Sequence, residues 1–176
     1  MHQAGTAIAV MLTLSLSAAV PQAARAQAAG GCTLQPVSGM ALQTLRCDRG
    51  VSVTAERGAR FQLIDRNGDG RVDGAKLDSK AILLDVDSAR VEGGFQVATP
   101  QAIAAVRGTR WAVDTGSGKT SVLVLRGSVS VRRPAGQAAV TLGPGQGVDV
   151  ESGSAPLVVK VWGAPRVAAL MARLGQ

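Results

Sequence analysis

The chain has 176 residues, which suits one compact domain, and a formal net charge of +7. Its two cysteines and single histidine, His2, are too few for a zinc site built on these residues, and tyrosine is absent. Because so few side chains could act as a general base near neutral pH, we expect a protein that binds rather than an enzyme.

The first predicted element is a secretory signal peptide over residues 1–26. Residues 7–20 form an uncharged apolar run, followed by Pro21 and by the small-residue cleavage pattern at 24–26 (ARA). The run is shorter than the about 20 apolar residues that cross a bilayer. We therefore expect an exported, periplasmic protein with no membrane span after cleavage. Cleavage would also remove His2, the only histidine of the chain.

The next predicted segment, residues 27–50, carries both cysteines, Cys32 and Cys47. In an oxidising compartment, an even pair of cysteines in a small domain predicts a disulfide. A bridge across a loop of this length stabilises a fold by about 3 kcal/mol, and it would tie the segment to the first strand of the domain. The spacing is longer than the C-x-x-C of redox proteins, so the predicted role is structural.

Residues 51–176 are predicted to form one all-β domain. Short apolar or alternating runs follow one another, separated by turns rich in glycine, of which the chain has 22. Their spacing is typical of an antiparallel β-sandwich or jelly-roll-like fold, with a β-helix-like coil as the alternative. The predicted strands are residues 51–56, 59–65, 80–87, 94–99, 110–114, 121–126, 128–132, 139–142, 148–150 and 157–162.

Only the C-terminal end departs from the strand pattern. Residues 165–175 place Val167, Leu170, Met171 and Leu174 at helical spacing. The segment begins with proline and ends with glycine, which suit the first turn and the C-terminal cap of a helix. The sequence therefore predicts one short amphipathic helix that packs against a sheet.

Residues 114–120 (DTGSGKT) end in the Gly-Lys-Thr of a phosphate-binding loop. The first glycine of that motif would fall on Val113, however, and residues 121–125 favour a strand where the motif needs a helix. We therefore predict a hairpin turn here and no nucleotide site.

Residues 65–74 (DRNGDGRVDG) contain the first half of a calcium-binding loop. Asp65, Asn67, Asp69 and Asp73 stand at ligand positions 1, 3, 5 and 9, but a lysine stands where position 12 requires a bidentate glutamate. The Asn-Gly and Asp-Gly pairs are also the strongest short signals for a hairpin. We predict a hairpin turn, with a weak structural calcium site as the alternative and no other cofactor.

The most specific pattern begins at residue 95. The run FQVATPQAIAAVRGT at 95–109 resembles the core signature of the FecR domain, and residues 120–131 and 140–147 resemble its following hairpin and its closing step. The matching motif residues are Thr99, Pro100, Val106, Arg107, Gly108 and Thr109. We expect the stretch 107–109 to determine the fold rather than bind a ligand, with a positive φ or a tight backbone position at its glycine.

The resemblance implies an exported β-domain of a kind used for protein–protein contacts in envelope signalling. FecR proteins proper are anti-sigma regulators with a cytoplasmic segment, one membrane span and a periplasmic domain that senses an outer-membrane transducer. Residues 1–26 instead resemble a cleavable leader, so we expect a stand-alone sensor or adaptor that docks on another envelope protein.

The positive charge favours one alternative function, which is the binding of an anionic cell-wall or surface polymer. Nucleic acid is not an expected partner, because the basic residues are not interleaved with stacking aromatics. The chain has only two tryptophans and two phenylalanines.

Overall fold

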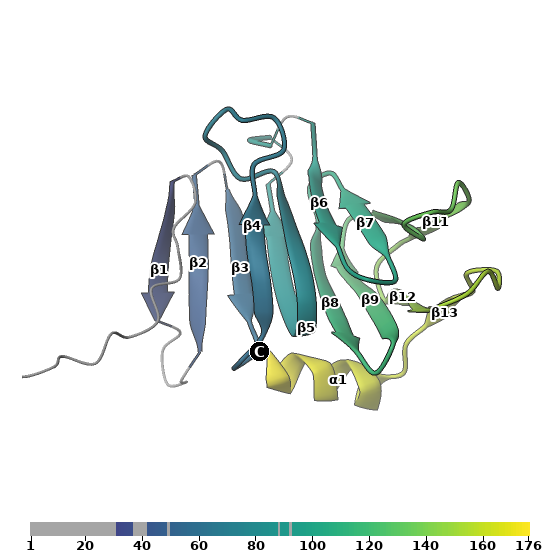
Figure 1. Ribbon diagram of the computed structural model, residues 1–176. Coiled ribbons are helices and arrows are strands. Elements are labelled where there is room, and N and C mark those ends of the chain that lie inside the picture. Colours follow the sequence, from purple (N-terminus) through teal and green to yellow (C-terminus); the bar gives the residue numbers. More distant parts are fainter. Residues whose placement is uncertain (1–30, 37–41, 49, 88, 92) are drawn as a thin grey trace, which may run out of the picture.

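The computed structural model describes residues 31–36, 42–48, 50–87, 89–91 and 93–176. The predicted signal peptide, residues 1–26, lies outside them. The described residues form thirteen strands and one helix (Figure 1), and no helix among them is long and apolar enough to cross a membrane. The elements are β1 Cys32–Pro36, β2 Gln43–Cys47, β3 Val51–Ala55, β4 Arg60–Ile64, β5 Gly74–Val86, β6 Phe95–Ala98, β7 Ile103–Val106, β8 Arg110–Gly116, β9 Lys119–Arg126, β10 Val129–Arg132, β11 Ala139–Leu142, β12 Gln146–Glu151, β13 Val159–Val161 and α1 Ala164–Arg173.

The strands form two layers that share one long strand. The large sheet has the order β1-β2-β3-β5-β8-β9-β12-β13, and the small sheet has the order β4-β5-β6-β7-β10-β11. Residues 74–79 of β5 pair with β4 in the small sheet, whereas residues 80–86 pair with β8 and β3 in the large sheet. The strand changes layer at Lys80, whose φ of +66° is uncommon for a residue that carries a side chain.

The predicted all-β fold with a short C-terminal helix is confirmed, and the layers form a nearly closed, barrel-like sheet rather than a coil. One pair departs from the predicted antiparallel arrangement: β5 and β6 are parallel, with Gly74 opposite Gln96. The reason is that β5 ends in the large sheet. The next strand, β6, starts in the small sheet beside the first end of β5, so it runs in the same direction as β5.

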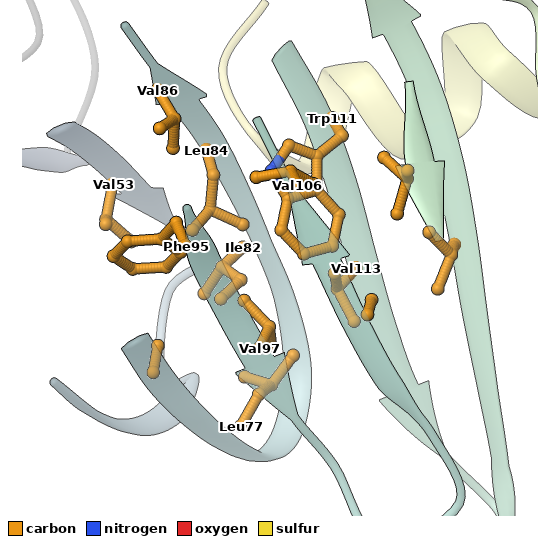
Figure 2. Close-up of a cluster of buried hydrophobic side chains, with 14 of the residues drawn as sticks. Val53, Leu77, Ile82, Leu84, Val86, Phe95, Val97, Val106, Trp111 and Val113 are labelled. Atoms are coloured by element: carbon orange, nitrogen blue, oxygen red, sulfur yellow. The ribbon is translucent and has the colours of Figure 1, made fainter. Parts of the chain in front are cut away.

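The core between the layers contains the two largest fully buried side chains, Trp111 of the large sheet and Phe95 of the small sheet. Figure 2 shows these rings among aliphatic side chains from both layers. The other two aromatic residues lie at the margins: Trp162 is 8% exposed beneath the helix, and Phe61 is half-buried at the edge of the small sheet. Apolar residues at every second position of the strands point inward and form this core.

Helix α1 packs on the outer face of the large sheet, and it lies at the lower ends of the strands in Figure 1. This second apolar cluster explains why residues 80–86 and 121–125 are nearly continuous apolar runs, since strands that are buried on both faces cannot alternate. The buried residues of the cluster are Ala81, Leu83, Ala112, Leu123, Trp162, Leu170 and Leu174.

Two arginines, about two helical turns apart, hold α1 on the sheet. Arg173 donates hydrogen bonds to Asp114 at 2.7 Å and to Glu56 at 2.6 Å, which raises the pKa of its guanidinium above the ordinary value. Arg166 pairs with Asp149 at 2.5 Å and lies 3.4 Å from the centre of the Trp162 ring.

Candidate functional site

Cys32 and Cys47 form a disulfide, as predicted. They lie directly opposite each other in β1 and β2, and β2 pairs in turn with β3. The sequence predicts that the bridge ties residues 27–50 to the first strand of the domain. Instead it joins two strands within that segment, and strand pairing attaches both of them to the large sheet.

The turn over residues 65–74 joins β4 to β5 as the predicted hairpin. The Asp65 carboxylate accepts the backbone N–H groups of Gly70 at 2.7 Å, Gly68 at 2.8 Å and Asp69 at 3.3 Å. Desolvation acts to raise the pKa of Asp65, but these hydrogen bonds outweigh it and hold the pKa below its ordinary value. The aspartate thus closes the turn on its own backbone.

The other candidate calcium ligands also have partners within the turn. Asn67 accepts the N–H of Asp69 at 3.3 Å, and Asp73 accepts the N–H of Arg66 at 2.9 Å and pairs with its Nε at 3.2 Å. Across the part of the chain that the structure describes, no group of three or more His, Cys, Asp or Glu side chains is placed to hold a metal. Calcium binding stays a prediction, and a Tm measurement tests it below.

Thr99 and Pro100 of the family motif open the turn between β6 and β7. The Thr99 N–H donates to the Ala102 carbonyl at 2.8 Å, and the Ala102 N–H donates to the Thr99 hydroxyl at 2.9 Å. The same buried hydroxyl shares a hydrogen bond of 2.8 Å with Thr120 of β9. Because β6 and β9 belong to different layers, this turn links the small sheet to the large sheet.

The motif residues 106–109 carry the chain from β7 in the small sheet to β8 in the large sheet. Gly108 has a φ of +62°, which few side chains tolerate. Thr109 is buried, and its N–H donates to the Val86 carbonyl at 3.0 Å while its hydroxyl donates to the Ser128 carbonyl at 2.9 Å. These are contacts that a fold determinant would make.

Two further glycines pack against this crossing. A Cβ on Gly94 would lie 2.5 Å from the Val106 carbonyl oxygen, and one on Gly127 would lie 2.6 Å from that of Gly108. Arg107 differs from its neighbours, because its side chain is exposed and forms no hydrogen bond or ion pair with the described residues. It is therefore the motif side chain most open to a partner.

Residues 114–120, which resemble part of a phosphate-binding loop, form a two-residue hairpin turn between β8 and β9, as predicted. Gly116 lies opposite Lys119, and Ser117 and Gly118 between them have φ values of +52° and +73°. The Thr120 hydroxyl is buried among other threonine hydroxyls instead of facing solvent. No helix follows the turn.

Residues 50–130 match the family model described as FecR protein. The chain contains a FecR domain. The match runs from the start of β3 into β10, so it includes both turns of the motif. In this chain the FecR segment is extended by β1 and β2 before it and by β11, β12, β13 and α1 after it.

Two crystal structures of a candidate anti-sigma factor from Parabacteroides distasonis ATCC 8503 have a fold similar to that of this chain. Each is 22% identical with a TM-score of 0.58, and they match 80% and 79% of this chain. This chain spans 64% of their length, which is less than two thirds. At 22% identity, the structural similarity shows a shared fold. No curated protein matches the chain.

Two grooves on the surface are candidates for binding a partner. One of about 550 Å³ separates the β10–β11 hairpin from the β12–β13 hairpin, at the right of Figure 1. Arg133 lines it and donates hydrogen bonds to the carbonyls of Glu151 and Ala155, so its guanidinium already ties the two sides together. The other groove, of about 260 Å³, lies between β2 and β4 and is lined by Leu34, Phe61 and other apolar residues.

The second groove has a basic end. Arg57 and Gly58 line it, Arg60 begins β4, and the Lys80 ammonium donates to the Arg57 carbonyl at 2.5 Å. None of these three cations forms an ion pair with the described residues. Sequence reasoning missed this groove. The alternation in β1 and β2 was a signal for the apolar side, but nothing local in the sequence places those strands beside β4.

Proposed function

We propose that the chain is an exported, non-catalytic protein that binds another envelope protein through its FecR domain and acts as a sensor or adaptor in envelope signalling. The observation that carries this proposal is the match of residues 50–130 to the FecR family model. A periplasmic location is part of the proposal. It is supported by the leader pattern of residues 1–26 and by the disulfide, which is typical of exported proteins.

The chemistry of the described residues supports a binding role. They include no histidine, and two neighbouring carboxylates, those of Glu56 and Asp114, are both bound by Arg173. Their oxygens accept hydrogen bonds from one guanidinium in the helix, and Glu56 also accepts the N–H of Ala81. This pair therefore supports helix docking rather than acid–base catalysis.

The test is crosslinking in living cells with the tagged full chain, followed by mass spectrometry of the captured proteins. We expect one envelope protein in stoichiometric yield, because a specific interface captures the same partner repeatedly. Capture of abundant proteins alone, in amounts that fall with rising salt, would contradict the adaptor function.

A second function, binding of an anionic envelope polymer, is supported by the unpaired exposed cations Arg57, Arg60 and Arg107. Its test is co-sedimentation of the purified protein with isolated cell-wall polymer. Binding through these charges should disappear at high salt, since exposed charges are screened within about 3 Å at 1 M ionic strength. Binding that persists at high salt would contradict this mechanism.

A further inference from the structure

The large sheet extends beyond the small sheet on one side of the molecule. β1 and β2 continue the large sheet past β3, whereas β4 ends the small sheet and, among the described residues, pairs only with β5. In Figure 1, β1 and β2 stand at the left with no described strand in front of them. At about 4.8 Å per strand, the overhang is about 10 Å wide, which is enough room for a further strand.

The inward face of this overhang is apolar, although no strand among the described residues covers it. Leu34, Leu45 and Val53 are register partners across β1, β2 and β3, so they lie on one face. Leu34 is 46% exposed, against 8% for Leu45 and 0% for Val53, so exposure increases toward the open edge. The opposite face carries polar residues such as Thr33 and Arg46. The inward face therefore has the apolar pattern of a sheet face that packs against another layer.

The free edge of β4 forms the other side of the groove. Phe61 and Leu63 point toward the core and are only half-buried. Because β5 is the one partner of β4 among the described strands, backbone N–H and C=O groups of alternate residues along the other edge of β4 can pair with a further strand. An extended segment paired with β4 would complete the small sheet and cover both Phe61 and Leu34.

The charges set the direction of such a segment. Arg57 lines the groove at the end where β4 begins, next to Glu56, whose carboxylate is bound by Arg173. Two further cations lie beside this end: Arg60 is the first residue of β4, and Lys80 donates to the Arg57 carbonyl. A strand that runs antiparallel to β4 finishes at this end. Acidic residues at its C-terminal end would therefore meet three cations that have no ion-pair partner among the described residues.

Antiparallel edge-to-edge pairing of two copies through β4 is unfavourable, because the β1–β2 overhang of each copy would meet the large sheet of the other. A dimer through β4 is therefore an outcome of the test below and not the occupant we propose.

We propose that this groove binds an extended segment of the partner protein by strand addition to β4. The segment is apolar at alternate positions, which face Leu34 and Phe61, and acidic at its C-terminal end, which faces Arg57 and Arg60. This inference rests on the proposed adaptor function, and it assigns the surface and the kind of partner that the function requires.

The first test uses a fluorescein-labelled peptide in which valine alternates with threonine and which ends in two glutamates. We expect saturable binding to the full exported chain by fluorescence anisotropy, together with slower amide exchange in residues 60–64, because strand addition protects that edge. The double variant Arg57→Glu/Arg60→Glu and the single variant Leu34→Asp should each weaken binding about tenfold or more. These side chains are exposed or half-exposed, so the fold should tolerate the changes.

The matched control lies on the opposite edge of the large sheet, in β13. The double variant Lys160→Glu/Val161→Asn also replaces an exposed cation and an exposed aliphatic residue, Val161 being 79% exposed. We expect it to bind the peptide like the original chain. Absence of saturable binding, equal loss in the control, or unchanged exchange in residues 60–64 would each overturn the proposal.

The second test separates this proposal from the adaptor function itself. A photo-crosslinking amino acid is placed in cells at exposed Gln62 of β4 or at Lys160 of β13. An adduct with an envelope protein from Gln62 that is lost in Arg57→Glu/Arg60→Glu supports the groove. An adduct from Lys160 alone, or one with a second copy of the chain, overturns the groove but leaves the adaptor function. No adduct from either position also overturns the groove, and the crosslinking of the tagged full chain then decides the adaptor function separately.

Discussion

Arg173 in the last turn of α1 and Glu56 after β3 lie 117 residues apart in the sequence and form an ion pair of 2.6 Å. The same guanidinium donates to both carboxylate oxygens of Asp114, at 2.7 Å and 3.0 Å. The Glu56 carboxylate also accepts the N–H of Ala81. The C-terminal end of the helix is therefore fixed to the large sheet through one side chain.

Replacing Arg173 with methionine should lower the free energy of unfolding by about 1–2 kcal/mol, because two half-buried carboxylates lose a charged partner. Urea denaturation measures the change. The control is Arg90→Met, which removes an exposed pair with Asp87 and should cost less than about 0.5 kcal/mol. Equal effects of the two substitutions would show that Arg173 does not fix the helix.

Asp149 should make the stability depend on pH. Desolvation acts to raise its pKa, but hydrogen bonds from Arg166 and Ser121 hold the pKa below the ordinary 3.8. A carboxylate with a lowered folded pKa stabilises the fold above its unfolded pKa, and this contribution is lost as the pH falls through the folded value. Asp149→Asn should therefore lower Tm at neutral pH and reduce the fall in Tm below about pH 4. The exposed Asp78→Asn serves as the control. A parallel downward shift of the Tm curve of Asp149→Asn at every pH would contradict the assignment.

Removing the disulfide by Cys32→Ser/Cys47→Ser should cost about 3 kcal/mol of unfolding free energy, given the separation of 15 residues. Guanidinium denaturation measures the loss, and amide exchange should show β1 opening first. Reducing agent should have the same effect on the original chain and none on the variant. If reduction leaves the original chain unchanged, the bridge contributes nothing to stability.

Gly127→Ala should destabilise the fold by about 2 kcal/mol or more, because the added methyl group meets the Gly108 carbonyl in addition to the cost of a positive φ. Gly118→Ala is the matched control, since its φ is also positive, at +73°, but the space around it is open. It should cost about 1 kcal/mol. Thermal unfolding compares the two, and a larger loss at Gly118 would contradict the close approach of Gly127.

Calcium should leave Tm unchanged, because the Asp65 carboxylate is already occupied by backbone N–H groups. Asp65→Ala should lower Tm to the same extent with and without calcium, since the turn loses the acceptor of three backbone N–H groups. Asp69→Ala is the companion variant. A rise in Tm with calcium that both variants abolish would establish the metal site instead.

The sequence predicted the elements whose local pattern matches their environment. Residues 121–126 and 51–56 read as strands, and the C-terminal helix was recognised from its apolar spacing. Sequence reasoning missed β1 and β2. Both strands are short, and residues 27–50 were predicted only as a segment held by the disulfide. β7, with two alanines, has weak strand propensity, and it forms because β6 and β10 flank it.

The same distinction between local pattern and tertiary arrangement separates the candidate sites that the sequence could predict from those that it could not. The motif residues from Thr99 to Thr109 could be found because they are contiguous, and the structure places their turns between the layers. The groove could not be found, since Leu34 and Phe61 come from strands of different sheets. Their proximity follows from the layer change of β5, which no local pattern shows.

That layer change also predicts how the molecule comes apart. Since β5 contributes to both sheets, neither sheet can lose its order without breaking the strand that holds the other together, and unfolding should occur in a single cooperative transition. Inserted residues in β5 would shift one sheet relative to the other, whereas the turn at 65–74 could accept an insertion locally. That turn is therefore the place to attach a reporter that leaves the interior undisturbed.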